Sequence, residues 1–274
     1  MVASFAGASV DFTIDAATVD GLKGLARQSR VSLFMVVQAA LAVLLHRLGA
    51  GVDIPIGTAV AGRTDDALDD LVGFFVNTLV LRTDVSGDPS FQVLLERVRE
   101  TDLAAFAHQD VPFERLVEVL NPARSLSWHP LFQVMLTLQN NADARVELPG
   151  LDCVVEQVGV PAAKFDLSFD LTETAEGMAG VLEYATDLFD ESSVLALVER
   201  FQRVLAAVVA DPRVQVSDIE ILTPAERRTL LHDANDTARP YEPGTIVAAV
   251  QEQAARTRTP SRPSAARSSS PTPS

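Results

Sequence analysis

One helix constrains the fold of this chain more than any other segment. Residues 33–48 read LFMVVQAALAVLLHRL, a run in which apolar side chains occupy nearly every side of a helix. Ser32 is a suitable N-cap, and Gly49 stands where helices commonly end in a left-handed residue. A helix that is apolar all round must be buried. Because the run has a start and a stop signal, we interpret it as the central helix of a layered protein rather than as a membrane span.

Five further segments have the pattern of β-strands. Three are rich in apolar, β-branched and aromatic residues, and a fourth alternates strictly from Phe165 to Leu171, which is typical of a half-buried antiparallel strand. The fifth follows it after a polar turn, so we expect these two to pair. The predicted strands are residues 52–60, 72–85, 131–140, 165–174 and 178–186.

Amphipathic patterns predict helices between these strands. Asp15 and Ser90 are placed to cap two of them, and Pro112 stands in the first turn of a third. The predicted helices are residues 15–30, 91–107, 112–120 and 191–209. Strands and helices mix without strict alternation, so the expected fold class is α+β, a sandwich of helices packed on a mixed β-sheet.

Charge and cysteine content argue against several classes of protein. The formal net charge is −15 over 274 residues, which disfavours nucleic acid as a partner. The one cysteine, Cys153, can form neither an intramolecular disulfide nor a cysteine-based metal site, and we expect no bound metal. The N-terminus lacks a basic segment followed by an apolar one. We therefore expect no signal peptide, no membrane partner and a cytoplasmic location.

The histidines are the candidates for acid–base chemistry. The sequence contains no G-x-S-x-G, H-E-x-x-H, phosphate-loop or dinucleotide-binding pattern. Of its four histidines, His108 and His129 lie in segments that could be functional loops. Residues 108–114 read HQDVPFE and admit two interpretations. One makes His108 a base with Asp110 or Glu114 as its partner, and the other makes the segment a loop and helix cap.

Three segments, in this order and spacing, resemble motifs of the condensation domains of nonribosomal peptide synthetases. They read GFFVNTLVLR at 73–82, HQDVPFERLVE at 108–118 and HPLFQVMLTLQN at 129–140. The segment 53–63 is similar to the sequence that precedes these motifs in the family. The segment 222–246 is similar to the linker from a condensation domain to the next adenylation domain. Several motifs in register make the resemblance specific.

The resemblance implies a fold and a set of partners. Complete condensation domains have two lobes, each similar to chloramphenicol acetyltransferase, with a tunnel between them. Phosphopantetheine arms of two partner carrier domains enter the tunnel, and the acceptor amine attacks the donor thioester to form an amide. By this resemblance, residues 1–221 are a single C-terminal lobe whose partners are the N-terminal lobe, carrier domains and an adenylation domain. Residues 222–255 are then the linker, and the composition of residues 256–274 predicts a disordered tail.

The family's active-site signature does not occur in this sequence. In the family, two adjacent histidines are followed three residues later by Asp-Gly in the N-terminal lobe, and this chain has no adjacent histidine pair. Aminolysis of a thioester needs groups that position the amine and stabilise the developing charge. We find no residue set that does both, so we expect no catalytic residue and no activity from the chain alone. A truncated remnant, a non-catalytic docking module and a half-enzyme completed by a separate N-terminal lobe all remain open.

Most residues of the three motifs are expected to have structural roles. Asp110 is placed to accept main-chain hydrogen bonds at the start of the following helix, Phe113 to anchor that helix in the core, and Glu114 to face its positive dipole end. The motif residues with expected structural roles are Gly73, Phe75, Arg82, His108, Gln109, Asp110, Pro112, Phe113, Glu114, Pro130 and Phe132.

Four polar residues are candidates for contact with the tunnel or the other lobe. Asn77 and Thr78 interrupt an otherwise apolar predicted strand, so they either satisfy buried main-chain groups or face the tunnel. Arg63 either forms a bracing ion pair or contacts substrate, and Gln133 is a candidate for the same kind of contact.

One lobe of a two-lobed domain should also expose apolar surface that its neighbour covers. The expected sources are the segment around Phe74 and Phe75 and the loop that holds Trp128 and Leu131.

Overall fold

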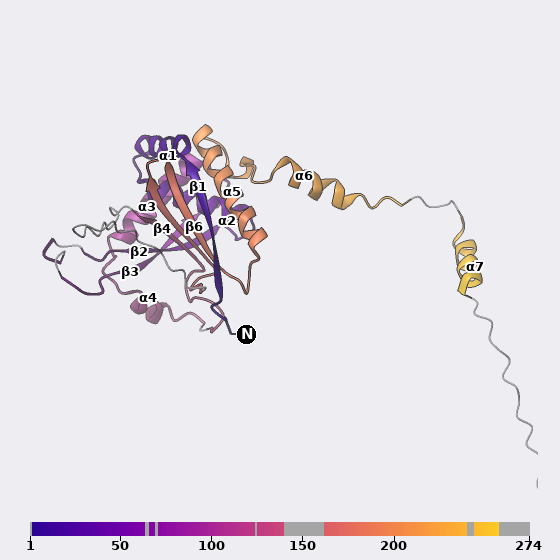
Figure 1. Cartoon of the computed structure of the whole chain (residues 1–274), viewed down its shortest axis with the longest axis horizontal. Helices are drawn as coiled ribbons and strands as arrows, with labels where there is room; N and C mark the ends of the chain where they lie inside the picture. Colours follow the sequence, from indigo (N-terminus) through magenta and orange to yellow (C-terminus); the bar gives the residue numbers. More distant parts are fainter. Residues whose placement is uncertain are drawn as a thin grey trace, which may run out of the picture. The chain divides into compact units, whose positions relative to one another are not determined.

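Two structural units contain the residues that the computed structural model describes, which are 2–63, 66–68, 71–123, 125–139, 162–239 and 244–257. The units are Met1–Thr223 and Pro224–Ser274, and each is described by itself (Figure 1). The division falls after Thr223, and the predicted start of the linker at residue 222 remains a prediction. Cys153 and the predicted tail beyond Thr257 lie outside the described residues.

One six-stranded mixed sheet organises the first unit. Its strands are β1 (Gly7–Asp15), β2 (Asp53–Val60), β3 (Asn77–Asp84), β4 (Val134–Gln139), β5 (Leu167–Thr174) and β6 (Gly177–Ala185). Their order across the sheet is β1-β6-β5-β4-β2-β3. β4 runs parallel to β2 and β5, and the other neighbours are antiparallel. The predicted mixed sheet is therefore confirmed, and so is the pairing of the strictly alternating strand with the one that follows it.

Four helices pack on one face of this sheet and enclose the main hydrophobic core. They are α1 (Ala16–Ser29), α2 (Leu33–Arg47), α3 (Phe91–Phe106) and α5 (Glu191–Ala210). Every residue from Met35 to Leu44 in α2 is buried, as expected for the central helix. The alternation along β1 places Val10, Phe12 and Ile14 in the same core. The burial of apolar faces from both layers is the main favourable term for this unit.

The helix starts follow local capping chemistry. The side chains of Asp15, Ser32 and Ser90 each accept a hydrogen bond from the main-chain N–H three residues later, at 2.9, 3.1 and 3.4 Å. Each bond satisfies one of the N–H groups that the first turn of a helix leaves without a partner. Gly49 has a φ of +96°, which is the left-handed conformation expected after α2.

Several element boundaries differ from the sequence-based expectation, and β5 for example begins at Leu167 rather than at 165. The strand expected at 72–85 begins at Asn77, and residues 71–76 lie outside the sheet. β4 begins at Val134 rather than at 131, and helix α4 (Phe113–Leu120) begins one residue after Pro112, which is its N-cap. The edge strand β1 was not predicted at all.

The second unit contains α6 (Pro224–Leu231), a short 3-10 turn η3 (Asp233–Asn235) and α7 (Ile246–Thr257). Their described side chains are intermediate to exposed, and none is buried. Among the described residues of both units, no single helix is long and apolar enough to cross a membrane. The α1–α2 pair, bent by 105°, meets the length and composition requirement only when the two helices are taken together.

Candidate functional site

Asn77, the first residue of β3, holds the loop that precedes α4. Its side-chain nitrogen donates to the carbonyl oxygens of Gln109 and Val111 at 2.7 and 2.8 Å. Its side-chain oxygen accepts from the main-chain N–H groups of Phe113 and Thr78 at 3.2 and 2.9 Å. One amide therefore satisfies four main-chain groups, which fixes the conformation of the HQDVPFE loop from outside that loop.

The polar residues of the HQDVPFE loop do not form a catalytic cluster. His108, Asp110 and Glu114 are all exposed, and Glu114 stands in the first turn of α4 as expected. The N-cap of α4 is Pro112 and makes no side-chain capping bond. Asn77, not Asp110, therefore satisfies the first N–H of this helix. The expectation that Asp110 caps α4 is wrong because a side chain from another strand takes its place.

An aromatic cluster connects α4 to the beginnings of β4 and β5. The ring centroid of His129 lies 5.2 Å from Phe113, 4.3 Å from Phe132 and 5.1 Å from Phe165. Phe132 is fully buried and lies against Gly57 of β2, where a Cβ atom would come within 2.1 Å of its ring. Phe113 is only partly buried and stands apart from the main core, which corrects its expected role as a core anchor.

His129 is the histidine with an unusual environment. Its Nδ1 atom is buried and has no hydrogen-bond partner among the described residues. Burial lowers the pKa of His129, although a main-chain hydrogen bond involving Phe132 acts in the opposite direction. The ring is therefore neutral near pH 7 and serves mainly as an aromatic wall. The Gln133 side chain donates to the His129 carbonyl at 2.8 Å and so holds this loop.

Arg63 organises the chain that leads into β3. Its guanidinium donates to the carbonyl oxygens of Leu68 and Leu71, the second at 2.8 Å, and lies 4.3 Å from the centroid of the Phe75 ring. Gly62, with a φ of +66°, lies so close to this segment that a Cβ atom would meet the Phe75 carbonyl oxygen at 1.9 Å. Cation–π attraction and close main-chain approach thus hold Phe75 in place.

The other motif residues lie apart from this loop chemistry. Thr78 is partly buried and pairs with Ala59 across β2 and β3. Arg82 forms an exposed ion pair with Asp53. Gly73 is exposed beside the Phe75 ring. The surface ion pair contributes little to stability because solvent screens it.

Residues 71–76 expose a run of large apolar side chains, and Figure 1 shows the chain here extending away from the helices that cover the sheet. Phe74 is 92% exposed, and Leu71, Val72 and Val76 are exposed as well. Trp128 is also exposed, as expected, while Phe75 and Leu131 are partly buried. A contiguous apolar run of this kind marks an interaction surface.

A buried polar junction joins α2, α3 and β3. The Gln38 side-chain nitrogen donates to Thr83 Oγ1 at 3.3 Å and to Asp102 Oδ1 at 3.1 Å, and all three residues are buried. Gln38 Oε1 and Asp102 Oδ2 have no partner among the described residues. Burial raises the pKa of Asp102 to about 6, although the bond from Gln38 acts against this shift.

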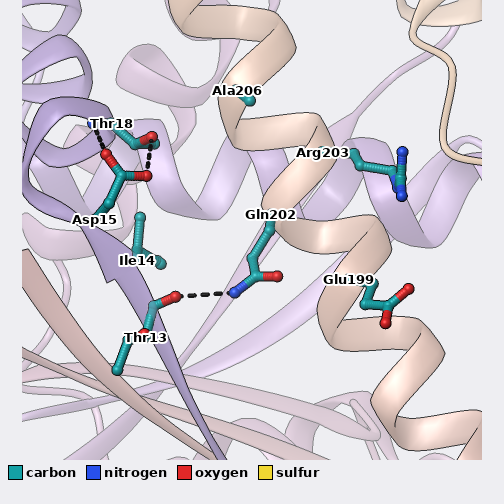
Figure 2. A pocket seen from close by; sticks show the side chains of 8 residues that line it. All are labelled: Thr13, Ile14, Asp15, Thr18, Glu199, Gln202, Arg203 and Ala206. Atoms are coloured by element: carbon teal, nitrogen blue, oxygen red, sulfur yellow. Dashed lines mark hydrogen bonds between the residues drawn. The ribbon is translucent and has the colours of Figure 1, made fainter.

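The described residues of the first unit enclose a smaller and a larger cavity. The smaller, about 390 Å³, lies between the end of β1 and α5 (Figure 2). There the Gln202 side chain donates to the Thr13 carbonyl at 2.8 Å, and Asp15 is occupied in capping α1. The larger, about 610 Å³, opens where β4 and β5 begin and β6 ends. Pro130 is the one residue with a sequence-predicted motif role among its lining residues.

The polar residues of the motifs act mainly on main-chain groups. In the part of the chain that the structure describes, no three His, Cys, Asp or Glu residues come together in a way that could hold a metal ion. Asn77, Gln133 and Arg63 each donate hydrogen bonds to main-chain carbonyls. These bonds position loops. The larger cavity could not be predicted from the sequence because its lining comes from four distant segments.

The geometry of this lobe matches that of condensation-type domains. The X-domain from teicoplanin biosynthesis has 39% sequence identity and a TM-score of 0.76, with 81% of this chain and 51% of that chain covered. The first condensation domain of the CDA synthetase has 25% identity and a TM-score of 0.66, with 80% and 48% covered. The fold is the chloramphenicol acetyltransferase-like α+β lobe that these proteins share.

A family model described as the condensation domain matches residues 1–231. The chain is 50% identical over 255 residues to a dimodular nonribosomal peptide synthase of Bacillus subtilis (strain 168), covering 91% of this chain and 11% of that protein. It is 52% identical over 235 residues to CymA, a probable non-canonical nonribosomal peptide synthetase of Salinispora arenicola (strain CNS-205), covering 84% and 3%. The chain therefore belongs to the condensation domain family of nonribosomal peptide synthetases and spans a small part of the length of these relatives.

Proposed function

We propose that this chain is the C-terminal lobe of a condensation domain and forms one wall of the site at which an amide bond is made. The substrates are aminoacyl or peptidyl thioesters held on the phosphopantetheine arms of carrier domains. The observation that carries this proposal is the extent of the structural matches. The lobe covers 51% and 48% of two solved condensation-type chains, so a second body of similar size completes each of them.

The chemistry of the described residues favours a structural role for this lobe over a catalytic one. The sequence has no adjacent histidine pair, and the polar residues of the three motifs hold main-chain groups. Positioning of the amine and stabilisation of charge must then come from the N-terminal lobe. This lobe contributes the fixed HQDVPFE loop and the apolar run at 71–76 that faces outward for a neighbour.

The test is reconstitution from two separate lobes. The chain is incubated with loaded donor and acceptor carrier domains, with and without an N-terminal lobe that bears the His-His-x-x-x-Asp-Gly motif, and products are identified by mass spectrometry. We expect amide product only when both lobes are present. A matched N-terminal lobe with its second histidine replaced by alanine should restore the uncatalysed background. Product from this chain alone would refute the proposal.

A docking role without chemistry is the second candidate. One observation favours it: a solved structure described as a complex of the X-domain and OxyB from teicoplanin biosynthesis is 38% identical to this chain, with a TM-score of 0.75. The X-domain, which is similar to this chain, therefore forms a complex with another protein, OxyB. Titration of the chain with isolated carrier and adenylation domains by calorimetry separates the candidates. Binding together with failure of the two-lobe assay favours docking.

A further inference from the structure

The larger cavity has the size of a small-molecule site. Its volume of about 610 Å³ falls within the range of roughly 300–1,000 Å³ that is usual for ligand pockets. Its walls come from residues 2–5, 125–130, 163–166 and 185–188, with residue 186 excepted. His129 and Pro130 of the third motif belong to this lining, but the proposed function assigns the cavity no ligand.

Residues 3–5 form one wall of the cavity, and three hydrogen bonds from their main-chain groups hold this wall in place. The Ala3 N–H donates to the Leu126 carbonyl at 3.0 Å, and the Ser4 N–H donates to the Asp187 carboxylate at 2.8 Å. The Phe5 carbonyl accepts from the Ala163 N–H at 3.0 Å. Phe5 has a φ of +58°, a conformation that is unfavourable for a bulky residue unless its surroundings fix it. The cavity is therefore a built feature and not a gap beside a loose terminus.

Aromatic rings dominate the apolar part of the lining. Phe5 and Trp128 line the cavity and are 58% and 55% exposed. The rings of Phe165 and His129, which belong to the aromatic cluster, also line it, with their centroids 5.1 Å apart. The faces of Trp and Phe rings attract cations, and Trp does so most strongly. Such a lining suits an apolar body with a positive charge.

One carboxylate of the lining has no partner. Asp166 is fixed by its main chain, whose N–H donates to the Gln133 carbonyl at 3.0 Å and whose carbonyl accepts from Ala185 at 3.1 Å. No group among the described residues donates a hydrogen bond to its side chain, and burial alone raises its pKa. By contrast, the Asp187 carboxylate is occupied by Ser4, whose hydrogen bonds lower the pKa of Asp187.

The neighbouring lysine does not neutralise this carboxylate. Lys164 is exposed, and its charge acts on Glu183, where it opposes the rise in pKa caused by burial and by Asp170. Among the described residues, Asp166 is thus a half-buried negative group that lines an aromatic cavity and has no counter-ion.

We propose that this cavity binds an organic ammonium group attached to an apolar body, with Asp166 as the counter-ion and Trp128, Phe165 and Phe5 as its walls. The ligand class is a small primary amine with an aryl or alkyl side chain. The proposal concerns this lobe alone and goes beyond amide formation, so its failure would leave the proposed function untouched.

Trp128 makes the proposal directly measurable because it is the only tryptophan in the sequence. Its fluorescence, excited at a wavelength that phenyl rings do not absorb, is followed while the full chain is titrated with 2-phenylethylamine or with the neutral analogue 2-phenylethanol. We expect a saturable change with the amine and at least tenfold weaker binding of the alcohol. 3-Phenylpropionate, which is anionic, should not bind.

The variant Asp166→Asn should weaken amine binding about tenfold and leave the alcohol unchanged. Asp170→Asn is the matched control, because Asp170 lies four residues further along, in β5 and outside the cavity lining, and its substitution should alter the binding of neither ligand. Equal binding of amine and alcohol to the unmodified chain would overturn the proposal, and this comparison needs no variant to fold. If only lysine- or arginine-containing peptides changed the fluorescence in an Asp166-dependent way, the occupant would be a protein side chain and the small-amine site would be ruled out.

Discussion

The helix-covered face of the sheet and the Asn77 loop region are held together by different means. On the first, α2 buries ten consecutive residues, and Phe169 and Phe201 are fully buried with ring centroids 5.4 Å apart. In the second, α4 has no buried residue, and a single amide holds its loop. The first region is stable through its own packing. The second region leaves Phe74 in solvent, which is the surface that the proposed N-terminal lobe would cover.

The largest contrast should come from removing one aromatic ring in each region. Phe169→Ala should lower the free energy of unfolding by about 3–5 kcal/mol, because it leaves a cavity in a packed core. Phe113→Ala should lower it by less than half as much, since its ring is partly solvated. Urea unfolding of both variants gives the two values. Similar losses would show that the aromatic cluster is an equal part of the core.

The buried Gln38–Thr83–Asp102 junction predicts a pH effect confined to the first region. The pKa of Asp102 rises from 3.8 to about 6 on folding, so the folded state binds more protons between these values. This contribution to stability is fully present below about pH 4 and is lost as the pH rises through 6, by up to about 3 kcal/mol at ~1.4 kcal/mol per unit.

Asp102→Asn mimics the protonated carboxyl and should remove this pH dependence. We expect the variant to be more stable than the unmodified chain at pH 8, by about 2–3 kcal/mol, and closely similar to it at pH 4. Thermal unfolding of both proteins across pH 4–8 measures the difference and cancels the titration of all other groups. A difference that is independent of pH would show that Asp102 keeps its ordinary pKa.

Loss of the Asn77 amide should affect the second region alone. Asn77→Ala leaves three main-chain groups of the loop and α4 without their partner, two of them partly buried, which should lower stability by about 1–2 kcal/mol. Hydrogen exchange of the Phe113 amide should accelerate, while the amides of α2 keep their protection. The control His108→Ala alters an exposed side chain in the same loop and should change stability by less than about 0.5 kcal/mol.

The smallest effect on stability, and the clearest on association, should come from the exposed apolar run. Phe74→Ser removes a side chain that contacts mainly solvent, so the unfolding free energy should stay within about 0.5 kcal/mol. Salt screens the net charge of −15 that opposes association, so the unmodified chain should self-associate at high salt. The Phe74→Ser variant should self-associate less under the same conditions. Sedimentation at low and high salt, with and without the substitution, measures this. A monomer at every salt concentration would indicate a self-sufficient lobe.

Local signals predicted the first region well. The caps at Ser32 and Ser90 and the apolar periodicity of α2 and α5 depend on residues close in sequence, so their patterns identify the elements. β1 is not predicted from the sequence, although Val10, Phe12 and Ile14 alternate with polar residues, because its partner β6 lies far along the chain and no nearby segment indicates the pairing. Residues 72–76 have strand-forming side chains but no strand partner, and β propensity alone does not provide one.

The second region depended on contacts that local patterns do not contain. Asn77 caps a helix 36 positions further along the chain, so a motif centred on Asp110 could not identify the capping group. The resemblance named Asn77 as important but left its role open. For Asp166, the sequence predicts only a position on the polar face of an alternating strand. Its place in an aromatic cavity depends on segments from both ends of the lobe.

The pairing of β1 with β6 has a consequence for how the chain is made. Gly7 pairs with Ala185 and Asp15 with Gly177, so β1 leaves the ribosome long before β6, its neighbour in the described sheet. At 5–20 residues per second, synthesis of the intervening chain, roughly 170 residues, takes about 10–30 s. During that interval β1 lacks its neighbour in the described sheet, and its apolar face stays exposed for longer. A circular permutant that places β1 after β6 should shorten this exposure.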